Sequence, residues 1–567
     1  MPKGEIVNKN LFLFLLFSVC FSNYLFPSDC CDDTGSSCLY GKNTWQPRPF
    51  SSYGSREIIM LKDLYDHPFK QDAWDGTLSV ATEYMRGTNN SCPSKNLGGM
   101  PFWSGTNSMI IGDNDGTADL DAYQFGMGDI LKQGSISLNP EIQQVGTDFL
   151  LHFTQYKHDR SLYFKIKANL GAMMIHSKLC EDAAVLDPST DRVWPLYPSV
   201  SSRYQSLSQA FAGGSTSSDA IVSSSLHKPL ALEYGRISCC KLTSIKLGDI
   251  ITTLGYNIHA DKNGFVGVGI KLSCPTGTVP KAKFIFEPIF GRAGHWGIGL
   301  DVTGHHKYEL QRCKDASLDL WMQADIMHLT TGRKPNWRSF DLKQNGPGSK
   351  YMIVQFYVPT NPTDENTLGR TPSYITQAVN ITTLPVLSSF SVEGSFAAML
   401  EFKKDNWNVG LSFDIWGRSS ELLKIDTCNM VNQNSANLND FAVLGRQVSE
   451  DILTNSPTAE PLYYCEPCAQ INKSQNRVLY NESVPSGIKD ARLGANRIPS
   501  TLDDALDIEG ASERRSTAGK LVASTGYSWN KKHYSPCVNV FAGLEFFKFD
   551  QFRLNMWSVG VHGALNF

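Results

Sequence analysis

The sequence predicts an all-β protein whose strands are antiparallel and apolar on one face only. Short segments in which apolar and polar residues alternate recur along the 567-residue chain, and the last one runs to the final residue. The composition agrees, because 46 glycines and 11% aromatic residues are typical of many short strands joined by turns. A hydrophobic content of 41% with 19% charged residues indicates a folded chain rather than a disordered one.

The last strand is predicted over residues 551–567, where apolar residues from Trp557 to Phe567 alternate with small or polar ones. A period of two places the two sets on opposite faces of a strand. A strand of a soluble sandwich would alternate in the same way, but it would not need an aromatic residue at the chain end. We expect this strand to pair with the first strand, near residues 77–86, and so to close the sheet.

This ending resembles that of Gram-negative outer-membrane β-barrel proteins, whose last strand alternates in this way and ends in an aromatic residue. The resemblance implies a transmembrane, antiparallel, up-and-down β-barrel in the bacterial outer membrane, with membrane lipid and the barrel insertion machinery as partners. It also implies that the machinery reads the apolar residues of this strand as an insertion signal: Trp557, Val559, Val561, Leu565 and Phe567.

The N-terminus is predicted to be a secretory signal peptide over residues 1–22, with Lys3 and Lys9 before an apolar core and cleavage after Ser22. The apolar core is short for a membrane-spanning helix, which needs about 20 residues, although an uncleaved anchor remains an alternative. Residues 23–72 are predicted to form a periplasmic arm or a plug inside the lumen. Within them, residues 55–66 are expected to form a short helix with Ser55 as its N-cap.

Five segments in the middle of the chain show one consistently apolar face, around residues 161–171, 266–272, 296–303, 396–403 and 409–418. Their other faces carry lysine, arginine, aspartate and glutamate, which suit a wet barrel lumen and not a sandwich core. The residues that we expect to line this pore are Lys165, Lys167, Lys271, Asp301, Glu401, Asp414 and Arg418.

Residues 73–567 are predicted to form a barrel of about sixteen strands, in the range 14–18, with long external loops. The segments begin near residues 77, 104, 118, 136, 159, 245, 263, 281, 294, 316, 349, 377, 405, 517, 536 and 552. A periplasmic C-terminus would place the tight turns near residues 113–117, 157–159, 261–264, 291–294 and 403–405 on the periplasmic side. The largest external inserts would lie near residues 175–243 and 419–517.

A barrel of this size would leave an aqueous channel, so the first hypothesis is a porin-like channel for the passive diffusion of small hydrophilic solutes. The second is a structural or surface-interaction protein, because the 14 cysteines resemble the load of cysteine-rich major outer-membrane proteins. Its partners would be a homo-oligomer or disulfide-linked neighbours, joined through cysteines among Cys30, Cys31, Cys38, Cys239, Cys240, Cys465 and Cys468. The third hypothesis is a secreted, soluble all-β adhesin.

The sequence contains no motif that predicts catalysis. HExxH, the GxSxG elbow and the P-loop signature are missing, and the aspartate run from Asp113 to Asp121 lacks the Gly and Glu of an EF-hand loop. The net charge of −3 does not indicate a nucleic-acid partner. We therefore expect a protein that is not an enzyme and that has no catalytic residue, cofactor or metal.

Overall fold

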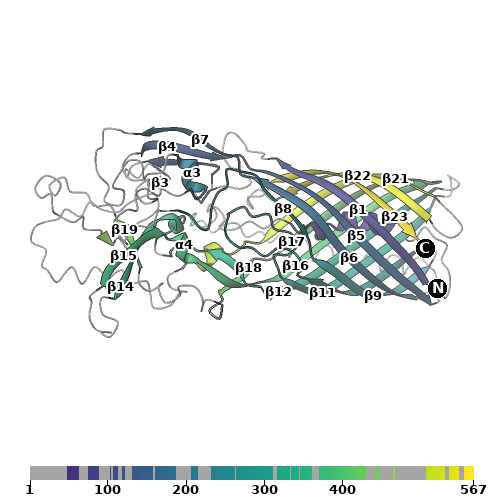
Figure 1. Cartoon of the computed structure of the whole chain (residues 1–567). Coiled ribbons are helices and arrows are strands. Elements are labelled where there is room, and N and C mark those ends of the chain that lie inside the picture. The colour runs from purple at the N-terminus through teal and green to yellow at the C-terminus, as the bar shows by residue number, and fades with distance from the viewer. Residues whose placement is uncertain are drawn as a thin grey trace, which may run out of the picture.

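A computed structural model describes residues 48–62, 74–88, 102–103, 106–112, 118–121, 125, 131–157, 160–186, 206–214, 231–261, 263–310, 316–332, 334–343, 345–359, 370–429, 441–445, 464–465, 506–529, 535–547 and 554–567. Twelve antiparallel strands form a closed, tilted barrel (Figure 1). They are β1 (Trp74–Thr88), β5 (Glu141–Lys157), β6 (Arg160–His176), β9 (Ile250–Asp261), β10 (Gly264–Cys274), β11 (Trp296–Glu309), β12 (Ala316–Thr330), β16 (Thr383–Lys404), β17 (Trp407–Arg418), β21 (Ser516–Ser528), β22 (Ser535–Phe547) and β23 (Asn555–Asn566).

The barrel closes where its first and last strands pair. β1 and β23 are hydrogen-bonded from Thr77 opposite Asn566 to Thr88 opposite Asn555. The terminal residue continues this ladder, because Phe567 and Gly76 exchange two backbone hydrogen bonds of 2.9 Å. The predicted partner of the last strand is therefore confirmed.

The prediction of about sixteen strands was wrong by four. The segments near residues 104, 118 and 349 form β2 (Ser108–Gly112), β3 (Leu120–Asp121) and β14 (Ile353–Pro359), which belong to two small sheets outside the barrel. Residues 281–290 form no strand, only a bridge between Arg236 and Phe284. Alternation shows only that one face of a strand is buried. A strand in a small sheet that packs on a core also has one buried face, so alternation does not distinguish it from a barrel strand.

The two ends of the barrel differ in their connections. We call the end where β1 begins and β23 ends the short-turn end, because β5 and β6, β9 and β10, and β16 and β17 follow one another there within a few residues. The opposite, loop end carries the longer connections. The turn at residues 291–294 leads into β11 at the loop end, so its predicted place was wrong, and residues 113–117 lie outside the described residues.

The connections at the loop end build a cap. One sheet joins β3, β2, β4 (Leu131–Leu138) and β7 (Leu179–Leu186), and another joins β15 (Arg370–Gln377), β14, β19 (Phe441–Gly445) and β20 (Tyr464–Cys465). β8 (Leu242–Leu247), β13 (Asn336–Ser339) and β18 (Glu421–Ile425) extend the barrel wall. The short helices are α3 (Leu207–Phe211), α4 (Val379–Thr382), α8 (Ile508–Ala511) and η6 (Ser349–Tyr351).

The cap has a hydrophobic core of its own. Phe125 stacks on Phe211 with ring centroids 4.6 Å apart, and Trp103 lies 4.9 Å from Tyr351. Buried residues at the loop ends of β5, β6 and β16 join the same cluster. The cap therefore packs as a continuation of the barrel and not as loose loops.

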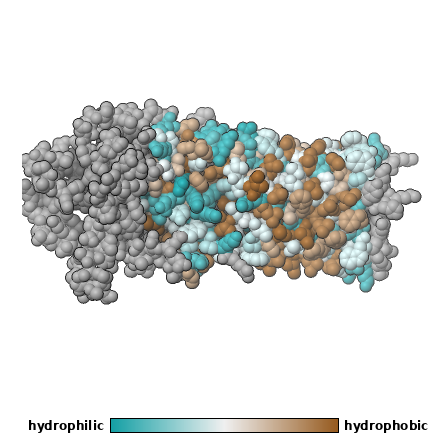
Figure 2. Space-filling view, viewed as in Figure 1, coloured by the Kyte–Doolittle hydropathy of each residue, from teal (hydrophilic) through white to brown (hydrophobic). Residues whose placement is uncertain are grey.

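The outer face of the barrel is apolar. Figure 2 shows a hydrophobic zone on the visible face of the barrel and a more hydrophilic surface toward the loop end. Exposed aromatic residues such as Trp74 and Trp407 lie at the short-turn end, and Trp296 and Trp557 lie nearer the loop end, as in the aromatic girdles of membrane barrels. The predicted signal residues of β23 all point outward into this band: Trp557, Val559, Val561, Leu565 and Phe567.

A closed barrel with an outward apolar band is the architecture that satisfies every backbone hydrogen bond within lipid. The protein is therefore an outer-membrane β-barrel, and the soluble adhesin hypothesis was wrong, because such a band would be a large exposed apolar surface in water. None of the helices in the described ranges is long and apolar enough to cross a membrane.

Candidate functional site in the plugged lumen

Residues 48–62 lie inside the barrel and are all buried; we call this segment the plug. It consists of η1 (Phe50–Ser52) and α2 (Gly54–Leu61). The sequence left open whether the region 23–72 forms an arm or a plug, and the structure places the described part of it in the lumen.

The first contacts of the plug are with the loop half of the wall. Arg48 forms ion pairs with Asp414 of β17 at 2.6 Å and Glu545 of β22 at 3.1 Å. The hydroxyl of Tyr53 donates a hydrogen bond of 2.9 Å to Glu545, and the Arg48 guanidinium lies 4.1 Å above the Tyr53 ring. This end of the plug is thus fixed by two carboxylates of the wall.

The N-terminus of α2 is capped by the wall and not by its own residues. Tyr53 occupies the N-cap without a side-chain hydrogen bond, so the predicted capping role of Ser55 was wrong. The backbone N–H of Ser55 donates to Asp414 Oδ2 at 3.0 Å instead. A carboxylate beside the positive end of a helix dipole is stabilising, so Asp414 both caps α2 and binds Arg48.

The middle of the plug carries two charges of opposite sign that bind different parts of the wall. Arg56 forms ion pairs with Glu83 of β1 at 2.5 Å and with Asp148 of β5 at 2.8 Å. Glu57 accepts from Lys167 at 3.0 Å and from Lys165 at 3.5 Å, both on β6. The plug is therefore held on several sides by charges.

The plug ends near the short-turn end of the barrel. Lys62 Nζ lies 2.6 Å from Glu401 Oε1 and 2.8 Å from Asn408 Oδ1, close to the turn between β16 and β17. The plug therefore runs from the loop half of the lumen to its short-turn half.

One apolar contact also depends on the shape of the wall. A Cβ on Gly146 of β5 would lie 2.4 Å from the Phe50 ring, which is far inside van der Waals contact. The ring of Phe50 also lies 3.7 Å below the Arg56 guanidinium. The plug thus fits against the wall at a position where only glycine leaves enough room.

All seven residues predicted to line the pore are buried inside the barrel. Lys165, Lys167, Glu401 and Asp414 contact the plug directly. The others lie on the wall around it: Lys165 binds Asp301 at 2.7 Å, Lys271 lies 3.4 Å from Asp325, and Arg418 occupies the loop end of β17.

The sequence reasoning missed four residues of the neighbouring strands. Glu83, Asp148 and Glu545 pair with the plug, and Lys520 supports them from the wall. Lys520 joins this network by an ion pair of 2.5 Å with Glu83. Each of these residues alternates with outward positions such as Leu521 and Leu544, and this alternation is the signal that could have revealed them.

The described cysteines form no disulfide within the chain. Cys239 and Cys240 are exposed free thiols within the chain, so their role as disulfide cysteines that link neighbouring proteins stays a prediction. Cys30, Cys31, Cys38 and Cys468 lie outside the described residues, and the side chain of Cys465 is not among those described.

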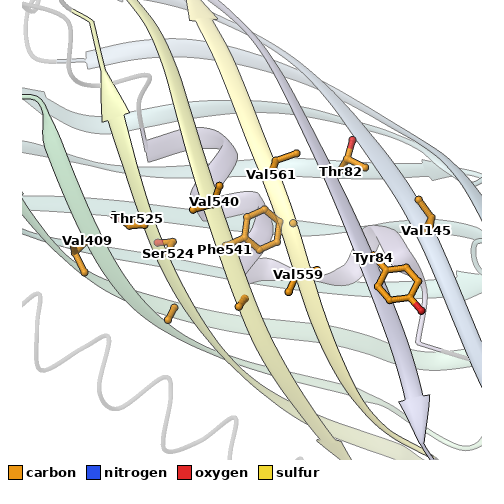
Figure 3. Close-up of a pocket in the computed structure, with 13 residues that line it drawn as sticks. Thr82, Tyr84, Val145, Val409, Ser524, Thr525, Val540, Phe541, Val559 and Val561 are labelled. Carbon is orange, nitrogen blue, oxygen red and sulfur yellow. The ribbon is translucent and has the colours of Figure 1, made fainter.

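The outer face carries a shallow groove of about 750 Å³ in the apolar band (Figure 3). It lies where β21, β22 and β23 present small residues, with Ala523, Ala542 and Gly560 between larger side chains such as Val540 and Val561. The plug ribbon is visible behind these strands in Figure 3. The groove belongs to the lipid-facing surface. None of its lining residues is part of the ionic network in the lumen.

No family model matches the sequence, and no curated protein matches it. Among solved structures, the chain is similar to an outer-membrane channel from Pseudomonas putida F1, at 8% identity and a TM-score of 0.33, with 88% of this chain and 99% of that chain covered. It is similar to the P. putida toluene transporter TodX at 7% identity and a TM-score of 0.27, with 94% of this chain and 96% of that chain covered. It is also similar to the β domain of the Bordetella autotransporter BrkA at 6% identity and a TM-score of 0.27, with 87% of this chain and 99% of that chain covered. Likeness at this level carries no conclusion about the function of this chain.

Proposed function

We propose that the protein is an outer-membrane channel for small hydrophilic solutes that is closed by its plug and opens when the plug is displaced. The observation that carries this proposal is the chemistry of the contact between plug and wall. Arg48, Arg56, Glu57 and Lys62 all bind oppositely charged wall residues inside the barrel.

If the segment served only to fill the lumen, apolar packing would hold it at a lower cost in free energy. Burying charges carries a desolvation cost that ion pairs only partly offset. A charged wall, by contrast, can be hydrated once the plug leaves. Several wall carboxylates and lysines also keep partners without the plug, as Lys520 and Glu83 do at 2.5 Å and Lys165 and Asp301 at 2.7 Å. The wall is therefore suited to a water-filled state as well as to the closed one.

The proposal modifies the hypothesis of a permanently open porin, because the lumen is occupied. It differs from a purely structural barrel in one measurable respect. A structural barrel would pass no solute whether the plug is bound or not, whereas a plugged channel would conduct once the plug is removed.

The test is conductance in planar bilayers with the full chain and with a variant lacking residues 48–62. We expect rare openings for the full chain and sustained conductance for the variant. The barrel fold of each protein is checked by its heat-modifiable migration on gels. A folded, inserted variant that passes neither ions nor a small sugar in liposome swelling would overturn the channel proposal.

A further inference from the structure

Arg418 differs from the other buried arginines of the barrel. Its side chain points inward at the loop end of β17 and is 3% exposed. Arg48, Arg56, Arg292 and Arg338 each form an ion pair with a carboxylate at 2.5–2.8 Å. Within the part of the chain that the structure describes, Nε and Nη2 of Arg418 have no hydrogen-bond partner.

The surroundings of Arg418 fix the orientation of its guanidinium. The guanidinium carbon lies 4.3 Å from the centre of the Phe390 ring and 5.6 Å from that of Trp416. Such cation–π contacts hold the planar group by its faces and leave its edges for hydrogen bonds.

The acidic residues nearby are already engaged by other arginines. Glu393 lies opposite Arg418 in the pairing of β16 with β17, and its Oε1 accepts from Arg292 Nε at 2.7 Å. Its Oε2 has no hydrogen-bond partner among the described residues, so it does not bind Arg418 either. Glu421 binds Arg338 at 2.8 Å. The His295 ring centroid lies 5.3 Å from that of Phe390, and His295 forms a hydrogen bond of 2.9 Å with Ser388. A histidine supplies no negative charge to Arg418.

Nε–H and Nη2–H lie on one edge of a guanidinium and point in parallel, which matches the two oxygens of a carboxylate or phosphate. Leaving these charged donors unpaired in a buried site is costly, so the fold provides a binding edge at the loop end of the lumen. We propose that this edge of Arg418 binds the carboxylate or phosphate group of a small anionic solute. The inference rests on the proposed channel function and names its substrate class.

The site also lies close to the plug. Arg292, which binds Glu393 next to Arg418, extends Nη1 to within 3.3 Å of Ser51 Oγ in the plug. An anion bound at Arg418 would therefore lie one ion pair away from the segment that closes the lumen.

The test is a titration of the full chain in detergent with sodium acetate and with inorganic phosphate, at constant ionic strength and with chloride as the replaced ion. Tryptophan fluorescence, to which Trp416 contributes as one of 11 tryptophans, gives one readout, and thermal unfolding gives an independent measure of binding. We expect saturable binding that weakens about tenfold or more in Arg418→Gln, since hydrogen bonds to charged groups contribute that much. Arg418→Lys, which keeps the charge but loses the parallel donors, should fall between the two.

Arg86→Gln is the matched control, because it removes an arginine whose ion pair with Glu141, at 2.7 Å, is partly exposed and does not include Arg418. Equal binding by Arg418→Gln and the unmodified chain, or no saturable response to either anion, would overturn the inference. The titration measures binding and does not depend on conductance. Anion binding by a barrel that never conducts would therefore contradict only the channel proposal. Conductance without anion binding would sink only the site.

Discussion

Removing the positive charge of Arg56 is expected to release the plug. In the closed state this side chain binds Glu83 at 2.5 Å and Asp148 at 2.8 Å. With the plug displaced, both carboxylates retain other wall partners, because Glu83 binds Lys520 at 2.5 Å and Asp148 accepts from Asn169 at 2.7 Å. The Arg56→Gln substitution therefore weakens the closed state and leaves the open wall almost unchanged.

The size of the effect follows from the cost of breaking a buried ion pair, about 3–5 kcal/mol when one partner is removed. Glutamine keeps one hydrogen bond, so we take about 2–3 kcal/mol, which shifts the ratio of open to closed channels by about 30- to 140-fold. The assay is open probability in single-channel recordings.

Arg86→Gln controls for the loss of an arginine from an ion pair outside the plug contact, and it should change the open probability less than twofold, as expected for a partly exposed pair. A folded Arg56→Gln channel whose open probability stays within twofold of the unmodified protein would refute the claim that charges hold the plug.

Three further outcomes are expected. Gly146→Ala should raise the open probability in bilayer recordings, because the added Cβ would collide with Phe50. Gly304→Ala is the control, because its Cβ would meet only a carbonyl oxygen at 3.7 Å, and it should leave the open probability unchanged. Equal effects of the two substitutions would contradict this. Val561→Arg should cost about 2–4 kcal/mol and lower the yield of inserted barrel in membrane fractions, while Val561→Ile should insert normally. Burial raises the pKa of Asp249, which precedes β9, to about 6 from 3.8, so stability present below pH 4 should fall by about 3 kcal/mol as the pH rises through 6. Asp249→Asn should flatten this part of the pH profile of thermal unfolding, and an unchanged slope would exclude Asp249 as its source.

The barrel could be predicted from the sequence because its wall obeys a period of two. Lys165 and Asp414 were assigned to the lumen by alternation alone, and both are buried there. The strand number could not be predicted in this way. β2 and β14 were counted as barrel strands, and only the three-dimensional pairing separates a cap sheet from the wall.

The ionic network was out of reach for a different reason. Arg56 and Glu83 are 27 residues apart and Arg48 and Glu545 are 497 apart, and no local pattern links them. Charges on the plug helix are ordinary on a solvated helix too. The unpaired edge of Arg418 likewise depends on which carboxylates its neighbours occupy, and that is a property of the folded barrel.

The plug is joined to β1 by only eleven residues, 63–73. Such a link reaches at most about 40 Å when fully extended, so the plug behaves as a ligand tethered to its own receptor. The effective concentration of a ligand on a short tether is about millimolar. A free peptide with the sequence of residues 48–62, added to a barrel that lacks them, should therefore close it as fully as the tethered plug does only at about millimolar concentration.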